Sequence, residues 1–345
     1  MLTLRKTEPG FGLTLSDVAP PEPGPGEVLV AVGATGVCGT DLHIYEWTPG
    51  YEFMASRMPV TIGHELAGTV SAVGPGVAGL AEGTLVTVRP SVVCGQCPAC
   101  VAGNSDACGN RTGIGVSRDG GFARFVAVPA ENCVIVPGHL DPEIAALTEP
   151  MTVSAEAVDT GDVRPGDRVL ILGPGSIGQG IALFAREAGA AEVVVVGRDD
   201  GFRLERLRSM GFPEVVDLGE RTLAEALAPY LAKGKFDVVI EATGVPAVVQ
   251  QGLDVLRKRG VLVVCGIHPR PANVDLTRLV REHQQIRGSY RAPLSTWPRV
   301  VDFLTRNTEL ARQMITHRLP LAEALAGFEL ARRKAVSKLI IFPQA

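Results

Sequence analysis

The segment "DRVLILGPGSIGQGIALFAREAG", residues 167–189, constrains the fold more than any other part of the chain. It reads as an apolar strand, a glycine-rich turn and a helix, and "AEVVVVGRDDGFRLERLRSMG" repeats the strand and the helix. Two further apolar runs, "KFDVVIEATG" and "GVLVVCGI", are expected strands. Apolar strands that alternate with helices are typical of a parallel sheet covered on both faces. We therefore predict a doubly wound α/β domain over residues 153–294.

The turn in this segment has the glycine spacing of a dinucleotide site. Gly173, Gly175 and Gly178 follow the pattern G-x-G-x-x-G between a strand and a helix. Gly173 permits the tight turn, Gly175 lets the backbone approach a pyrophosphate, and Gly178 lets the helix pack closely on the strand. Ser176 and Ile177 open the helix, whose amides and dipole favour phosphate. The alternative is an ordinary glycine-rich turn.

The residues after the second expected strand bear on which dinucleotide binds. An acidic residue normally ends that strand and binds the ribose hydroxyls. Here Gly197 and Arg198 occupy that place, and Asp199 and Asp200 follow. A guanidinium at Arg198 would pair with a 2′-phosphate, so we favour NADP over NAD, with Arg203 as a further candidate contact. In the alternative, Arg198 points to solvent and Asp199 serves NAD.

The rest of the chain has a different pattern. Up to about residue 150, short apolar or alternating runs such as "EVLVAV" and "FARFVAVP" are separated by glycine and proline turns, which is typical of a β-rich domain. After about residue 295, a helix leads to a tail that ends in an expected strand, "SKLIIFP". We expect this strand to return to the first domain, so that residues 1–152 and 295–345 form one domain around the other.

Composition excludes several classes of partner. The net charge is −4, with 46% hydrophobic and 20% charged residues, which gives no reason to expect nucleic acid or an anionic membrane as partner. No stretch reaches the roughly 18 uninterrupted apolar residues of a membrane span. The first residues lack the apolar core of a signal peptide. We expect a cytoplasmic protein.

A lobe at residues 91–110 contains four cysteines in the pattern C-x2-C-x2-C-x7-C, at Cys94, Cys97, Cys100 and Cys108. In a long chain without a secretion signal, clustered cysteines favour a metal over disulfides. Four thiolates suit a closed tetrahedral Zn²⁺ site that supplies folding energy to a lobe with little core of its own. An iron–sulfur cluster also takes four thiolates, but nothing else in the sequence indicates electron transfer.

The remaining candidate ligands are distributed over three segments. Cys38 lies in "GVCGTDLHIYEW", His64 and Glu65 in "VTIGHELAGTV", and Glu149 in "ALTEPMTV". A carboxylate in an apolar context such as that of Glu149 needs a partner if it is buried. Cysteine, histidine and carboxylate together suit a catalytic zinc that keeps an open position.

Together these motifs resemble the zinc-containing medium-chain alcohol dehydrogenases from end to end, and most closely the polyol (sorbitol-type) and L-threonine 3-dehydrogenase branch. The motifs that carry the resemblance are "GVCGTDLH", "GHE", the four-cysteine lobe, "EP" at 149–150 and "GPGSIG". The resemblance implies a GroES-like β-rich catalytic domain split around a Rossmann domain. It also implies a dimer or tetramer formed through the edges of the Rossmann sheet.

The resemblance also assigns roles to residues. It implies two zinc ions per chain, a structural one in the four-cysteine lobe and a catalytic one held by Cys38, His64 and Glu149. Glu65 matches a fourth carboxylate that ligates zinc in some states and yields to water or substrate in others. A catalytic zinc acts as a Lewis acid toward an alcohol.

Three polar residues after Cys38 support this chemistry. We expect Asp41 to accept from the second ring nitrogen of His64 and so to fix its tautomer. Thr40 is expected to take the proton of the alcohol. His43 resembles the relay of the family to solvent, although an ordinary surface histidine is the alternative.

The substrate is the least constrained feature. The run "HIYEW" is similar to L-threonine dehydrogenases, but "EPMTVSAEAV" departs from their "GNAVH"-like segment. The run "IRGSYRAPLSTWP" resembles polyol dehydrogenases, in which an arginine and an aromatic residue face the substrate. Arg291 and Tyr45 are therefore candidate contacts, with a surface or interface salt bridge as the alternative for Arg291. We favour a polyol or sugar alcohol oxidised to a ketose, with L-threonine or another small hydroxy compound as the alternative.

Two other classes of function are possible. Zinc-free relatives, such as quinone reductases and a lens crystallin, would bind NADPH without alcohol chemistry, but the intact set of Cys38, His64 and Glu149 argues against them. A purely structural metal protein is opposed by the glycine turn in its strand–turn–helix setting.

Overall fold

The computed structural model describes residues 1–345 and divides into two compact units. The first comprises Met1–Glu149 with Pro293–Ala345, and the second is Pro150–Ala292. The division falls within helix α4 (Thr148–Thr160). None of the helices has the length and apolar character that crossing a membrane requires.

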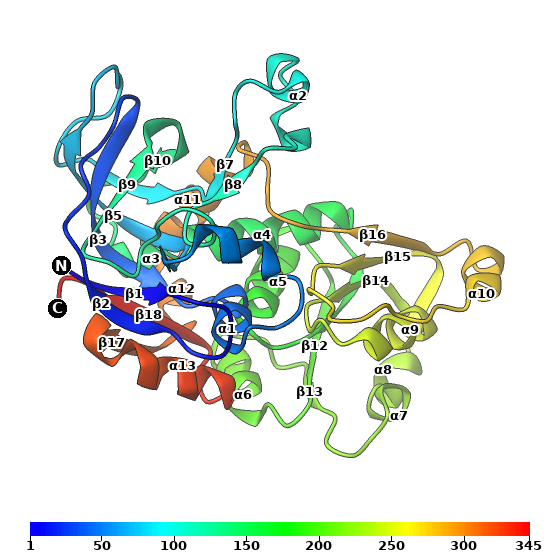
Figure 1. Ribbon diagram of the computed structural model, residues 1–345. Helices are drawn as coiled ribbons and strands as arrows, with labels where there is room; N and C mark the ends of the chain where they lie inside the picture. The colour runs from blue at the N-terminus through cyan, green and yellow to red at the C-terminus, as the bar shows by residue number, and fades with distance from the viewer. The chain divides into compact units, whose positions relative to one another are not determined.

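The first unit is built on a seven-stranded sheet of order β10-β6-β5-β3-β18-β17, with β9 also paired to β3. In β3, every second side chain faces the core, so Val28, Val30 and Val32 are fully buried. The C-terminal strand β18 pairs antiparallel with β3, and Figure 1 shows this red strand beside the blue N-terminal strands. The strands are β3 (Glu27–Gly36), β5 (Glu65–Val73), β6 (Leu85–Val88), β9 (Phe125–Pro129), β10 (Cys133–Ile135), β17 (Ile315–Pro320) and β18 (Lys338–Phe342).

Smaller elements complete this unit. A three-stranded sheet of order β2-β1-β4 is formed by β1 (Leu2–Lys6), β2 (Thr14–Asp17) and β4 (Val60–Thr61), and β7 (Ser91–Val92) pairs with β8 (Thr112–Gly113). The helices are α1 (Gly39–Glu46), α2 (Pro98–Val101), α3 (Pro142–Ala145), α11 (Thr296–Arg306), α12 (Thr308–Arg312) and α13 (Ala324–Arg332), with short 3₁₀ turns η1 (Glu52–Arg57), η2 (Ser105–Ala107), η3 (Ala130–Asn132) and η4 (Leu321–Glu323).

The second unit is a six-stranded parallel sheet of order β13-β12-β11-β14-β15-β16. Its chain order reverses between β11 and β14, which is the switch point where such sheets bind ligands at their carboxyl edge. The predicted fold class, a β-rich GroES-like part and a Rossmann-type parallel sheet, is confirmed. The elements are β11 (Arg168–Leu172), α5 (Ser176–Glu187), β12 (Glu192–Gly197), α6 (Gly201–Ser209), β13 (Val215–Asp217), α7 (Leu223–Ala226), α8 (Ala228–Leu231), β14 (Phe236–Glu241), α9 (Pro246–Val255), β15 (Leu256–Val264), α10 (Leu276–Arg281) and β16 (Gln285–Gly288).

Candidate active site

The pairing of β3 with β5 brings two distant sequence motifs together. The strands are antiparallel and Gly36 lies opposite Glu65. Cys38 follows Gly36 by two residues, and His64 precedes Glu65 directly, so both lie at the same end of the strand pair. A potential ligand group results: the donor atoms of Cys38, His64 and Glu65 lie within 4.8 Å of one another.

The Asp41 carboxylate contacts both Cys38 and His64. Cys38 caps helix α1 with extended backbone (φ −102°), and its amide donates to Asp41 Oδ2 at 2.9 Å. Asp41 Oδ1 lies 3.5 Å from Nδ1 of His64. Because Nδ1 faces this fully buried carboxylate, the other ring nitrogen is left as the donor available to a metal.

Burial and charge set the ionisation of the group. His64 is 6% exposed and Glu65 is 1% exposed. Burial alone would lower the pKa of His64, but the Asp41 carboxylate and the Cys38 thiolate together raise it well above its ordinary value. A metal that binds here therefore displaces a proton from the imidazole, as metals do when they compete with protons for ligands.

Glu149 lies within electrostatic reach of the same group. Burial raises its pKa to about 7; the Glu65 and Asp41 carboxylates add to the shift, while His64 and Lys338 oppose it. The close group itself contains Cys38, His64 and Glu65, and does not include Glu149. The thiol, imidazole and carboxylate set fits Zn²⁺, which accepts sulfur, nitrogen and oxygen ligands in one site.

Two further polar side chains, Thr40 and His43, lie on α1 beside the group. The Nδ1 atom of His43 lies 3.1 Å from Oγ1 of Thr48, and its ring stacks on Tyr51 with 5.9 Å between centroids. Burial lowers the pKa of His43, and Glu46 opposes the shift. Burial raises the pKa of the Tyr51 phenol, while a hydrogen bond with Thr40 opposes this and Cys38 adds to it. Tyr51 therefore lies next to both Thr40 and His43.

Tyr45 does not present its hydroxyl to the metal-ligand group. Its side chain is 6% exposed and packs against Phe11 and Phe328, with ring centroids at 4.7 and 5.5 Å. Its hydroxyl donates to Glu329 Oε1 at 2.7 Å. Tyr45 therefore packs on the buried face of α1, and its contact with a substrate stays a prediction.

Arg291 belongs to the second unit. It is exposed, has a left-handed backbone (φ 66°), and its guanidinium lies over the Tyr290 ring, 4.6 Å from the centroid. No acidic partner holds it, so the alternative of a salt bridge within the chain is not the observed arrangement. Its contact with a substrate stays a prediction.

The four cysteines of the lobe converge as their spacing predicts. Their sulfurs lie 3.5 Å (Cys97–Cys100), 3.6 Å (Cys94–Cys108) and 4.0 Å (Cys94–Cys100) apart. A tetrahedral site with metal–sulfur bonds of about 2.3 Å requires sulfurs separated by about 3.8 Å. The lobe is cyan in Figure 1, and its elements α2 and η2 contribute no buried residue. No disulfide joins its cysteines. A bound metal would therefore supply folding free energy that the lobe does not gain from a core of its own.

The glycine turn of the second unit has the geometry of a phosphate site. Gly173 has φ 115°, and a Cβ at Gly178 would lie 1.8 Å from the Gly173 carbonyl oxygen, so both positions require glycine. A Cβ at Gly175 would meet nothing within 4 Å, which leaves open space beside the backbone. Ser176 and Ile177 form the first turn of α5, whose amides point to this space.

The segment after β12 lies at the same sheet edge, because β12 pairs parallel with β11. Arg198 is exposed and donates to the Gly219 carbonyl at 2.9 Å. Asp199 is also exposed, and its amide donates to Asp217 Oδ1 at 2.9 Å. Arg198, the candidate contact of a 2′-phosphate, and Asp199, the alternative contact of the ribose, therefore both lie on the surface at the carboxyl edge of the sheet.

Arg203 lies one turn into the next helix. Its guanidinium is 3.5 Å from Oδ1 of Asp200, which is 6% exposed and caps α6. This ion pair holds Arg203 close to Asp200, at the end of the segment after β12.

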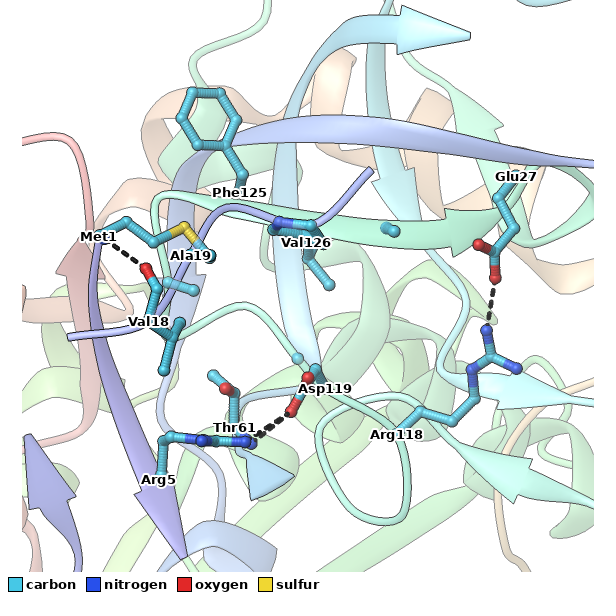
Figure 2. A pocket seen from close by; sticks show the side chains of 14 residues that line it. Met1, Arg5, Val18, Ala19, Glu27, Thr61, Arg118, Asp119, Phe125 and Val126 are labelled. Atoms are coloured by element: carbon cyan, nitrogen blue, oxygen red, sulfur yellow. Dashed lines mark hydrogen bonds and ion pairs between the residues drawn. The ribbon is translucent and has the colours of Figure 1, made fainter. Parts of the chain in front are cut away.

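A separate cavity of about 390 Å³ opens in the first unit between β1 and β9. Figure 2 shows its charged side chains directed at one another: Arg118 donates to Glu27 at 2.6 Å, and Arg5 faces Asp119 at 3.9 Å. The charged side chains of this cavity are thus paired with one another within the fold.

Sequence reasoning missed three residues near the candidate sites. Tyr51 stacks on His43, Asp217 accepts hydrogen bonds from the segment after β12, and Lys338 pairs with Glu65. For Lys338 a signal existed, since a lysine opens the otherwise apolar strand "KLIIF". Tyr51 and Asp217 lie in ordinary polar segments of the sequence, which gave no such signal.

Comparison with known proteins identifies the family. Residues 24–138 match the family "Alcohol dehydrogenase GroES-like domain", and residues 176–306 match "Zinc-binding dehydrogenase". An L-threonine 3-dehydrogenase of Pyrococcus horikoshii is 39% identical over 81% of this chain and 80% of its own length. That of Saccharopolyspora erythraea is 35% identical over 99% and 98%.

Solved structures agree with this. A zinc-binding dehydrogenase of Sinorhizobium meliloti bound to NADP is 32% identical, with a TM-score of 0.89 over 99% of both chains. Galactitol-1-phosphate dehydrogenase of Escherichia coli is 26% identical, with a TM-score of 0.88 over 99% of this chain and 100% of its own. L-idonate 5-dehydrogenase of the same species is 27% identical, with a TM-score of 0.85 over 99% and 98%. The chain therefore belongs to the zinc-binding medium-chain alcohol dehydrogenases, a family of oxidoreductases.

Proposed function

We propose that this protein oxidises a secondary hydroxyl of a polyol or sugar alcohol to the ketone and transfers the hydride to NADP. The observation that carries the proposal is the group of half-buried Cys38 with buried His64 and Glu65, which has Glu149 in electrostatic reach. A structural metal site has all its positions filled by protein ligands and needs no carboxylate that can dissociate from the metal. A catalytic site must keep one coordination position for the alcohol.

Cys38, His64 and Glu149 would hold the catalytic zinc, and Glu65 would share the fourth position with substrate. When bound, zinc acts as a Lewis acid that lowers the pKa of a hydroxyl and polarises a ketone in the reverse direction. Asp41 orients His64 through Nδ1, which leaves Nε2 as the nitrogen that would face the metal. The lobe cysteines would hold a second zinc with no open position.

The residues around α1 provide a route for the alcohol proton. Thr40 Oγ1 accepts the proton of the alcohol, and the Tyr51 phenol, whose pKa Thr40 influences, lies beside it. His43, whose ring stacks on Tyr51 and whose Nδ1 lies 3.1 Å from Thr48 Oγ1, is the group that would exchange the proton with solvent. The lowered pKa of His43, caused by burial, keeps the ring neutral near neutral pH, so it can accept a proton.

The choice of NADP rests on Arg198. It occupies the place where an acidic residue would select NAD, and its guanidinium is exposed at the carboxyl edge of the sheet. The Sinorhizobium meliloti relative binds NADP, which supports this choice. A guanidinium is also the side chain best suited to a 2′-phosphate.

The choice of a polyol rests on "IRGSYRAPLSTWP", with Arg291 as a substrate contact, and on the relatives that act on galactitol 1-phosphate and L-idonate. L-threonine is the second candidate, because the two relatives named L-threonine 3-dehydrogenase above are 39% and 35% identical to this chain. Both candidates are small molecules with a secondary hydroxyl next to a second polar group, which suits one metal site.

The test is an initial-rate screen of the zinc-loaded protein. Reduction of NADP and of NAD is followed with a polyol panel and with L-threonine. We expect turnover on one or more polyols and little on threonine. Turnover on threonine alone would replace the polyol by the second candidate, and a zinc-free protein that binds NADPH but oxidises no alcohol would belong to the quinone-reductase-like class.

A further inference from the structure

Lys338 forms a buried ion pair with a carboxylate of the metal-ligand group. Its side chain is fully buried, and Nζ lies 2.9 Å from Oε1 and 2.7 Å from Oε2 of Glu65. The third donor position of the ammonium is used by the Val37 carbonyl at 3.1 Å. Burying the Lys338 ammonium and the Glu65 carboxylate costs free energy, because both charges lose their hydration. The hydrogen bonds to all three donor positions of the ammonium offset part of this cost.

The surroundings explain why this position carries a cation. Burial would lower the pKa of Lys338, but Glu65, Cys38 and Glu149 all act to raise it, and the net shift is upward. The ammonium therefore contacts the Glu65 carboxylate directly and lies within electrostatic reach of Cys38 and Glu149, all of which belong to the candidate catalytic site. Replacing it with a neutral side chain would leave the charge of Glu65 to be balanced by the metal alone.

Glu65 consequently has two possible cationic partners. Its oxygen lies within 4.8 Å of the donor atoms of Cys38 and His64, which is the reach of a shared metal ion. Both of its oxygens also accept from Lys338. The more strongly the ammonium holds the carboxylate, the less the carboxylate neutralises a metal.

The pair is held by rigid elements, so the distance between its members is set by the fold. Lys338 opens β18, which pairs with β3 through Ile340 and Gly36, and its own amide donates to Met314 at 3.1 Å. Glu65 opens β5, which pairs with the other edge of β3. Positions built on strands are more precise than positions on loops.

We propose that Lys338 is a positioning residue that competes with the catalytic metal for the Glu65 carboxylate and so keeps the fourth coordination position exchangeable. This inference rests on the proposed function of the same site. Without Lys338, Glu65 stays on the metal and the substrate position closes.

The test uses the Co²⁺-loaded full-length protein and imidazole, a small ligand that enters an open coordination position. The visible difference spectrum on adding imidazole reports only the catalytic site, because the four-thiolate lobe has no open position. We expect K338M to weaken imidazole binding about tenfold, the usual scale for partners of metal ligands, and K338R to restore it. An unchanged or lower Kd in K338M overturns the inference.

Lys6 provides a matched control. It is also buried, at 1% exposure, but its ammonium bonds to the carbonyls of Gly10 and Gly12. K6M loses a buried lysine without touching Glu65, so its imidazole Kd is expected to equal that of the wild type. Weakening in K6M equal to that in K338M would mean that the effect reports general loosening, and would overturn the inference.

A double variant tests whether Glu65 causes the weaker imidazole binding. It also provides a second measurement if K338M alone folds poorly. K338M/E65Q removes both charges together, so no carboxylate remains to close the site, and the imidazole Kd is expected to return to the wild-type value. A double variant that binds as weakly as K338M contradicts the competition. If wild-type Co²⁺ protein shows no imidazole response at all, it is the proposed function that fails, because no open metal site then exists.

Discussion

Gly36 and Glu65 lie opposite one another on β3 and β5, and a Cβ at Gly36 would lie 2.1 Å from Oε2 of Glu65. The absence of a side chain at Gly36 is thus what lets the carboxylate turn toward Cys38 and Lys338. The metal-ligand group depends on this space as much as on its ligands.

Gly36→Ala is therefore expected to displace the Glu65 carboxylate and break its pair with Lys338. Crowding in a packed core typically costs about 1–3 kcal/mol, so the urea unfolding midpoint should fall accordingly. Turnover should fall as well, because the fourth ligand position is distorted. Gly39→Ala is the control, since a Cβ there meets nothing within 4 Å. Equal midpoints for both variants would show that the space beside Gly36 is not required.

Cys38→Ser is expected to abolish turnover while leaving NADP binding intact, because the metal ligand and the glycine turn belong to different units. Metal content should fall from two ions per chain to one. Atomic absorption and a fluorescence titration with NADPH check the two parts. Cys133→Ser, which changes a cysteine outside both clusters, should change neither quantity. Equal loss of turnover and cofactor binding in Cys38→Ser would contradict separate sites.

Cys97→Ser is expected to release the metal of the lobe and to unfold residues 91–110 locally. The lobe has almost no apolar core, so its metal supplies most of its folding free energy. Limited proteolysis with mass spectrometry should show cleavage within the lobe, with the catalytic metal retained. A lobe that resists protease after losing its metal would show that the loop packs adequately by itself.

These sites differ in how far sequence alone could predict them. The glycine turn and the four-cysteine lobe are local patterns, so spacing was sufficient to expect both. Cys38 and His64 are far apart in sequence and meet only through the β3–β5 register, so the resemblance to a family was needed to pair them.

Contacts between the two ends of the chain could not be predicted from the sequence. Lys338 reaches Glu65 across 273 positions, and Tyr45 reaches Glu329 across 284. Whether a tyrosine hydroxyl faces a substrate or a neighbouring helix depends on such pairings, which no local pattern encodes. The sequence analysis missed both the Lys338–Glu65 pair and the Tyr45–Glu329 hydrogen bond for this one reason.

Arg198→Asp is expected to move cofactor preference from NADP toward NAD. The guanidinium that pairs with the 2′-phosphate is replaced by a carboxylate that repels it and can bind ribose hydroxyls. The ratio of kcat/KM for NADP to that for NAD should fall by at least about tenfold, the scale of one lost charge-assisted contact. Arg221→Asp is a control at a nearby exposed arginine. A ratio that stays constant in Arg198→Asp would remove this residue from cofactor selection.

The stability of the metal-free protein should depend on pH through Glu149. Its pKa is raised by burial from 4.5 to about 7, so the folded state binds more protons than the unfolded state between these values. Stability contributed by the protonated carboxyl is thus present below about pH 4.5 and is lost as the pH rises through about 7. Compared with Glu149→Gln, the metal-free wild type should lose unfolding free energy across this window, measured by urea titration. Added Zn²⁺ should remove the difference, because the metal binds the ionised form. A constant difference between the two proteins from pH 4.5 to 7 would mean that Glu149 titrates as an ordinary carboxyl.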